Sequence, residues 1–138
     1  HLVDVKVKEG DYVNVGDSRG YLFRQQQLRQ ITRDHSVAFE VYSNGGISKE
    51  TLHTHPNRSL LTRTLGKEIV VPDFFHGKIQ TGDIFLLCSD GLTGELQDTE
   101  IEQVLRSSKN LAEMGQELIQ RANTAGGKDN ITLILTQI

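Results

Sequence analysis

The chain has 138 residues and a formal net charge of −3, with 36% hydrophobic and 6% aromatic residues. A chain of this length forms one domain or part of one. The acidic balance argues against nucleic acid as a partner, and no apolar run approaches the length of a membrane span. The single cysteine, Cys88, excludes an internal disulfide. Because Cys88 lies in an apolar run, we expect a buried, inert thiol and a reducing, cytoplasmic setting.

The N-terminal part of the chain is predicted to form short strands. Apolar and polar side chains nearly alternate over residues 2–8, which is typical of a strand with one buried face. These strands are expected at residues 2–8, 12–15, 20–24 and 28–31. Polar turns at 9–11 and 25–27 separate them. Short strands joined by tight polar turns favour an antiparallel sheet.

A polar insertion at residues 36–58 has helical spacing instead. Ser36 is placed to cap a helix that ends at Gly45 and Gly46. A second short helix at 48–54 is expected to stop before Pro56. The insertion therefore interrupts the strands with two short helices.

The second half combines strands with two amphipathic helices. Extended segments are expected at 60–65, 69–71, from 74, at 84–88 and at 131–138. Asp98 is expected to cap the first helix, and Asn110 the second. The apolar stripe of the second helix would carry Leu111, Met114, Leu118, Ile119 and Ala122. Helices that follow strands in blocks predict an α+β fold, with helices on an outer face of a sheet.

Three aspartates stand in short polar turns beside apolar stretches. Asp17 follows Val-Gly, Asp90 follows Cys-Ser, and Asp129 follows Gly-Gly-Lys. Taken singly, each is an ordinary turn residue. Together, carboxylates at strand ends from distant parts of the chain are what a hard-cation site needs, with some positions left to water.

Five segments resemble, in order, the motifs of the metal-dependent protein phosphatases, also called the PPM or type 2C family, and most closely its bacterial branch. They are Gly-Asp-Ser-Arg at 16–19, Ile-Thr-Arg-Asp-His-Ser at 31–36, His-Pro at 55–56 with Leu-Thr-Arg-Thr-Leu-Gly at 61–66, Gly-Asp-Ile-Phe-Leu-Leu-Cys-Ser-Asp-Gly-Leu at 82–92, and Asp-Asn-Ile-Thr at 129–132. One tetrapeptide would be weak support, but five in the family order cover nearly the whole chain.

The resemblance implies the C-terminal part of a four-layer αββα sandwich with antiparallel sheets. Residues 1–138 would be a partial phosphatase catalytic domain, and residues 36–58 would correspond to the family's mobile flap. The family's Asp-Gly-x-Gly-Gly motif, whose Asp bridges two catalytic metals, is absent from the chain. The Arg that grips the substrate phosphate in the family lies further upstream and is also absent. We therefore expect this chain alone to be inactive.

The resemblance also implies the metal ligands. Asp90 and Asp129 would bind one of two catalytic Mn²⁺ or Mg²⁺ ions, and Asp17 with Asp90 would hold a weaker third ion. The ions activate a water that attacks phosphorus, so no protein nucleophile is needed.

Neighbouring residues are expected to support these ligands. Gly91 permits a sharp turn and a close approach of the main chain. Ser89 is interpreted as a hydrogen-bonding residue beside the site. Asn130 either orients the Asp129 loop or forms an ordinary Asx turn.

Several basic side chains have competing interpretations. Arg19 is expected to form a fixed ion pair inside the fold. Arg58 and Arg63 either contact a phosphoprotein or lie on a solvated face. His53 and His55 could chelate zinc, but they lack further ligands, which favours a role in the flap.

The implied activity is hydrolysis of phosphoserine and phosphothreonine in phosphorylated proteins, opposing a Ser/Thr kinase. The alternative is a non-catalytic, phosphatase-like domain that regulates or switches a partner. The presence of the upstream Asp-Gly motif in the parent gene would favour the enzyme.

Overall fold

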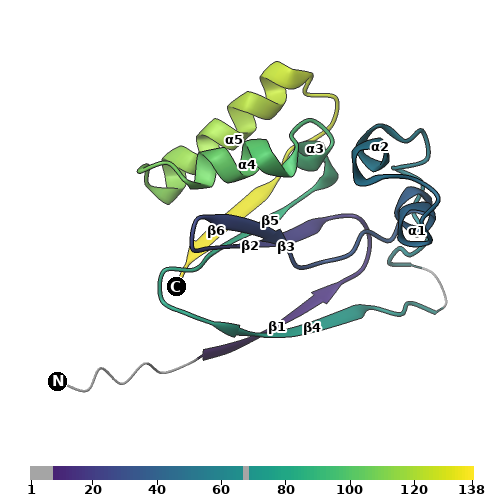
Figure 1. The fold of residues 1–138 in the computed structure, drawn as a ribbon, viewed down its shortest axis with the longest axis horizontal. Helices are drawn as coiled ribbons and strands as arrows, with labels where there is room; N and C mark the ends of the chain where they lie inside the picture. Colours follow the sequence, from purple (N-terminus) through teal and green to yellow (C-terminus); the bar gives the residue numbers. More distant parts are fainter. Residues whose placement is uncertain (1–7, 67–68) are drawn as a thin grey trace.

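The computed structural model describes residues 8–66 and 69–138, which form three layers (Figure 1). Helices from the C-terminal half cover one face of a four-stranded sheet, and a two-stranded sheet lies on its other side. Tyr12 and Phe85 join the two sheets, with ring centroids 5.6 Å apart. Within the described residues, no helix covers the outer face of the smaller sheet.

Every strand pairing is antiparallel, as the sequence predicts. The strands are β1 (Lys8–Asn14), β2 (Arg19–Arg24), β3 (Gln27–Gln30), β4 (Asp73–Ile79), β5 (Ile84–Cys88) and β6 (Leu133–Gln137). The larger sheet has the order β3-β2-β5-β6, and the smaller one pairs β1 with β4. The expected strand at 2–8 lies outside the described residues except for its last position.

The turn predicted at residues 9–11 is wrong. β1 runs through this segment without a break, so that Gly10 lies opposite Gly77 and Asp11 lies opposite His76. Pairing with a strand that is distant in sequence holds these residues extended. Local turn preference is a weaker influence than this tertiary contact.

Five helices complete the described structure. They are α1 (Val37–Ser43), α2 (Lys49–Thr54), α3 (Asp90–Thr93), α4 (Asp98–Leu105) and α5 (Leu111–Ala125). Ser36 caps α1, because its hydroxyl accepts a hydrogen bond from the Phe39 amide at 3.3 Å. Asn110 caps α5 and forms a reciprocal capping box with Glu113, as expected for that helix.

The predicted cap of α4 is wrong by one residue. Gln97 occupies the N-cap position, and the Glu100 carboxylate accepts a hydrogen bond from the Gln97 amide at 2.8 Å. Asp98 is the first residue of the helix, and its carboxylate accepts the hydroxyl of Tyr21 at 3.0 Å instead. The Asp98 side chain does not cap the helix, because it binds a residue that is distant in the sequence.

The hydrophobic core lies between the larger sheet and α3–α5. Its buried members are Tyr21, Phe23, Ile84, Leu86, Cys88, Leu92, Leu96, Ile101, Val104, Leu105, Met114, Leu118 and Ala122. Ile119, predicted to belong to the apolar stripe, is 37% exposed. Burial raises the pKa of the Cys88 thiol to about 12, which agrees with the expected inert thiol.

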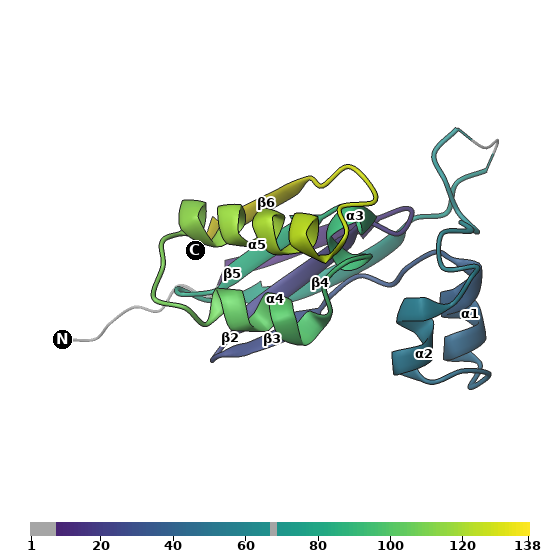
Figure 2. The ribbon, with the colours of Figure 1, turned by 90° about the horizontal axis from the view of Figure 1, so that it is seen from above.

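Residues 36–58 contain α1 and α2 and project from one end of the sheets (Figure 2). Their boundary residue Ser36 forms an isolated bridge with Leu61. An ion pair of 3.0 Å joins Lys49 of α2 to Asp98 of α4. None of the helices in the described part of the chain has the length and apolar character that crossing a bilayer requires.

Candidate functional site

A pocket of about 230 Å³ lies between α3, the 36–58 segment and the start of β2. All three aspartates singled out from the sequence, Asp17, Asp90 and Asp129, line it. Two further carboxylates and three basic side chains share the lining, namely Asp34, Glu95, Arg19, Arg58 and Lys128. The fold therefore brings together three short turns that lie far apart in the sequence.

Each aspartate is held by a junction between elements. Asp17 follows Gly16, whose φ of +112° forms the turn between β1 and β2. Asp90 is the first residue of α3, immediately after β5 and the N-cap Ser89. Asp129 lies in the connection from α5 to β6. Strand and helix ends thus fix the direction of each carboxylate-bearing turn.

Ser89 fastens the Asp90 turn to the Asp129 turn. Its hydroxyl donates to the Asn130 carbonyl at 3.1 Å and accepts from the Thr132 amide at 3.1 Å. The Ser89 amide also donates to the Thr132 carbonyl at 3.0 Å. Asn130 contributes its main chain to this clamp, and its amide donates to the Asp129 carboxylate at 2.7 Å. These contacts tie the two turns together, and a supporting role of Ser89 and Asn130 in metal binding stays a prediction.

The electrostatics of the pocket suit a cation. Burial, followed by the nearby charge of Asp90, raises the pKa of the Asp17 carboxyl above its usual value. No hydrogen bond or ion pair from the described residues engages the side chain of Asp90. A carboxylate that is repelled by its neighbour gains from a divalent ion, and oxygen donors of this kind prefer hard cations. The residues present therefore fit Mn²⁺ or Mg²⁺.

The carboxylates do not form a closed metal cage by themselves. Within the described part of the chain, no group of three His, Cys, Asp or Glu side chains is close enough to hold an ion alone. Further ligands must come from water or from residues beyond this set. Metal binding by Asp17, Asp90 and Asp129 thus remains a prediction.

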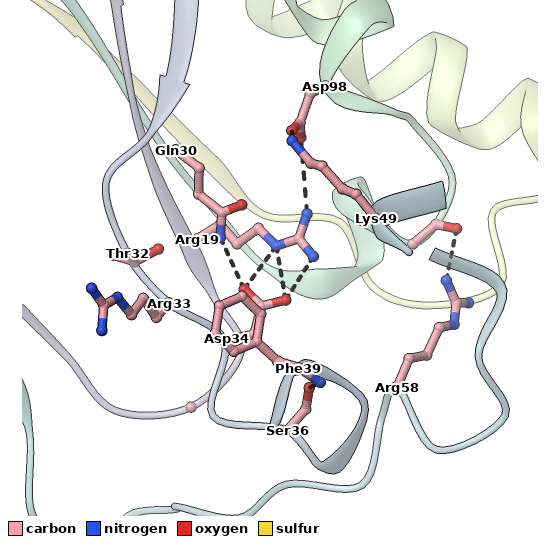
Figure 3. Close-up of polar contacts among 12 residues, drawn as sticks. Arg19, Gln30, Thr32, Arg33, Asp34, Ser36, Phe39, Lys49, Arg58 and Asp98 are labelled. Atoms are coloured by element: carbon pink, nitrogen blue, oxygen red, sulfur yellow. Dashed lines mark hydrogen bonds and ion pairs between the residues drawn. The ribbon is translucent and has the colours of Figure 1, made fainter. Parts of the chain in front are cut away.

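Arg19 forms the fixed ion pair that was expected (Figure 3). Its Nε donates to both carboxylate oxygens of Asp34, at 2.9 and 3.0 Å, and its Nη2 donates to Oδ2 at 2.6 Å. Burial opposes the charge of the guanidinium, but these hydrogen bonds raise its pKa above the usual value. Arg19 also acts to lower the pKa of Asp17, but burial and the charge of Asp90 have larger effects.

The chain of polar contacts continues from Arg19 to the 36–58 segment. Arg19 Nη1 donates to the Tyr21 hydroxyl at 3.2 Å, and this hydroxyl donates to Asp98. The second oxygen of the Asp98 carboxylate accepts from Lys49 of α2. This arrangement links β2, α4 and α2 beside the pocket.

Arg58 and Glu95 are among the pocket residues that were not assigned to the metal site from the sequence. Arg58 donates from Nη1 to the Gly94 carbonyl at 3.2 Å, so it stands at the C-terminal end of α3 (Figure 3). This bond and its place in the pocket wall favour the alternative in which Arg58 contacts a phosphoprotein, and that contact stays a prediction. Glu95 accepts a hydrogen bond from the Lys128 amide at 3.4 Å, next to Asp129. No local motif marks either residue, because both roles arise from contacts across the fold.

The remaining basic and imidazole groups have structural contacts. Arg63 is paired with Asp73 at 2.7 Å. The Nδ1 atom of His55 accepts the amide of Asn57 at 3.1 Å, a local contact within the 36–58 segment. The side chain of His53 lies outside what the structure describes.

Comparisons with known proteins agree on one family. The serine/threonine phosphatase Stp of Listeria monocytogenes is 48% identical over 125 residues, which are 90% of this chain and 50% of that protein. The crystal structure of Stp1 from Staphylococcus aureus superposes with a TM-score of 0.91 at 37% identity, covering 96% of this chain and 52% of that one. No protein-family model matches the sequence.

A third similar structure contains metal. It is the catalytic domain of the phosphatase PstP in complex with two manganese ions, at a TM-score of 0.84 and 35% identity, covering 94% of this chain and 53% of that one. The chain spans about half the length of the relatives it matches. The sequence motifs, the fold and these similarities agree, and the chain belongs to the bacterial PPM family of serine/threonine phosphatases.

Proposed function

We propose that the full-length protein hydrolyses phosphoserine and phosphothreonine in phosphoproteins, with Asp90 and Asp129 as ligands of the catalytic metal. The observation that carries this proposal is the convergence of Asp17, Asp90 and Asp129 on one pocket. The manganese ions in the similar PstP domain support a divalent metal. When bound, such ions supply an activated water and neutralise the phosphoryl oxygens.

The residues of this chain would prepare the site for that chemistry. The Ser89 clamp ties the Asp90 turn to the Asp129 turn, and it would keep the two carboxylates near each other for an ion. Asp17 would hold the additional, weaker ion together with Asp90. Arg58 and Lys128 place positive charge on the pocket wall, which suits the dianionic phosphate of a substrate.

The proposal includes Mn²⁺ or Mg²⁺ as the metal, a Ser/Thr kinase as the opposing enzyme and the cytoplasm as the location. A phosphatase assay on the full-length protein tests its central claim. We expect phosphate release from phosphoserine and phosphothreonine peptides that requires Mn²⁺ or Mg²⁺ and stops with a chelator. Release of phosphate at the same rate in the presence of a chelator would overturn the proposal. Absence of release with every metal and peptide would favour the non-catalytic alternative.

A further inference from the structure

The turn that carries Asp17 is held by the side chain and main chain of His35. The Gly16 amide donates to His35 Nδ1 at 3.1 Å, and the His35 amide donates to the Gly16 carbonyl at 3.0 Å. Asn14 adds a donor to the same carbonyl at 3.4 Å. Both polar groups of the Gly16 main chain are therefore occupied, and Asp17 follows directly.

The opposite side of the imidazole is also fixed. His35 Nε2 lies 3.2 Å from Oδ2 of Asp73, and Arg63 binds the other oxygen of Asp73 at 2.7 Å. The His35 side chain is only 4% exposed, so water does not compete effectively for either nitrogen. Arg63 Nη1 also lies 3.3 Å from His35 Nε2. A buried imidazole whose two nitrogens both have partners has one defined orientation.

The hydrogen bonds also determine the tautomer. A nitrogen that accepts an amide proton carries no proton itself, so Nδ1 is unprotonated. The proton of the neutral imidazole is then on Nε2, where it is donated to Asp73. Arg63 has only donors, so it cannot accept this proton although its Nη1 lies 3.3 Å from Nε2, and its shorter hydrogen bond, of 2.7 Å, goes to Asp73.

We propose that His35 is a positioning residue: with its proton on Nε2, it connects Asp73 at the start of β4 to the Gly16 main chain, and it thereby holds Asp17 toward Asp90 for the additional metal ion. The metal part of this inference rests on the proposed function. Outer partners of metal-binding groups commonly act in this way, by fixing the direction of a ligand that they do not replace.

Two substitutions separate the two nitrogens of the ring. The side-chain oxygen of Asn in His35→Asn can occupy the place of Nδ1, so it keeps an acceptor for the Gly16 amide. The longer side chain in His35→Gln reaches the place of Nε2, so it keeps the contact with Asp73 and loses the one with Gly16. His35→Ala loses both. Ile101→Val, which removes one methyl group from the core on the far side of the sheet, controls for general loss of stability.

The experiment uses the full-length protein and has two readouts. The first is nuclear magnetic resonance without metal. We expect an unprotonated Nδ1 and a protonated Nε2 in the wild type, and a Gly16 amide whose hydrogen exchange is slow in wild type and His35→Asn but fast in His35→Gln and His35→Ala. The second is calorimetric titration with Mn²⁺. We expect the weakest site to lose about tenfold in affinity in His35→Gln and His35→Ala, but not in His35→Asn or Ile101→Val.

A protonated Nδ1, or slow Gly16 exchange in His35→Ala, would overturn the inference. An equal loss of Mn²⁺ affinity in Ile101→Val would do so as well, because it would show a general effect of stability. If the wild type binds no Mn²⁺ at all, the proposed metal chemistry fails together with the part of the inference that depends on it. The resonance measurements still decide whether His35 holds the Gly16 turn.

Discussion

The main chain of Asn130 lies so close to Gly91 that a β-carbon at residue 91 would stand 2.3 Å from the Asn130 carbonyl oxygen. Real β-carbons do not approach so closely, and the contacted atom belongs to the main chain, which cannot rotate away. Gly91 follows Asp90, and Asn130 follows Asp129. This contact therefore sets how near the two predicted metal ligands can come to each other.

Replacing Gly91 by Ala should push these two turns apart. We expect a loss of stability of about 1–3 kcal/mol, which is typical of overpacking, together with weaker binding of Mn²⁺ in the full-length protein. Thermal unfolding and calorimetric titration measure the two effects. Gly77→Ala is the matched control, because a β-carbon there meets nothing within 4 Å. Equal Mn²⁺ affinity in Gly91→Ala and wild type would show that this contact does not set the metal geometry.

Much of this fold could be predicted because the relevant signals are local. The alternation in β6, the caps Ser36 and Asn110, and the turn at Asp17 each depend on residues that are close together in the chain. The three aspartates could be proposed as one site because their turns share a pattern and a family order. Their common pocket agrees with that proposal.

The errors have non-local causes. The continuity of β1 depends on its pairing with β4, and the partner of Asp98 is Tyr21 on β2. α3 is a single turn, too short to show a helical period in the sequence. Arg58 reaches the pocket through a bond to Gly94 on another element. None of these contacts can be read from neighbouring residues alone.

The three aspartates should differ in their effects on metal binding. In the full-length protein, Asp129→Ala should weaken the tight Mn²⁺ site by about tenfold or more, whereas Asp17→Ala should weaken only the additional site. Asp90→Asn should affect both, because it faces Asp17 and is clamped to the Asp129 turn. Calorimetric titration, paired with activity at increasing Mn²⁺, distinguishes the sites. If Asp17→Ala abolishes tight binding while Asp129→Ala preserves it, the two assignments are reversed.

Asp83 should make stability depend on acid pH. Its carboxylate is 2% exposed and accepts hydrogen bonds from Arg24 at 2.8 and 2.6 Å and from the Gln80 amide at 2.8 Å. The hydrogen bonds from Arg24 outweigh burial and hold the pKa of Asp83 below its usual value. A lowered folded-state pKa contributes stability above the unfolded pKa, and this contribution is lost as pH falls through the folded pKa.

Asp83→Asn should therefore be less stable than wild type by about 2 kcal/mol near neutral pH, since it loses charge-assisted hydrogen bonds. The difference should shrink below about pH 4, the usual pKa of an unfolded Asp. Urea unfolding of both proteins across this range measures it. A difference that is the same at neutral and acid pH would contradict the assigned role of the Asp83 charge.

The ion pair between Lys49 and Asp98 should set the position of the flap without stabilising the fold. Lys49 is 65% exposed, and such pairs contribute at most about 1 kcal/mol. Lys49→Met should therefore leave thermal unfolding nearly unchanged. It should, however, release α2 from α4. The 36–58 segment, which contains α2, contributes Leu52 and Arg58 to the pocket lining. We expect a KM for phosphopeptides that rises several-fold, with little change for a small aryl phosphate that needs no contact with the flap.

Lys109→Met removes a comparable exposed pair, that with Glu117, away from the flap, and it should change neither KM. Equal phosphopeptide KM values in Lys49→Met and wild type, or equal increases in both variants, would show that this ion pair does not position the flap.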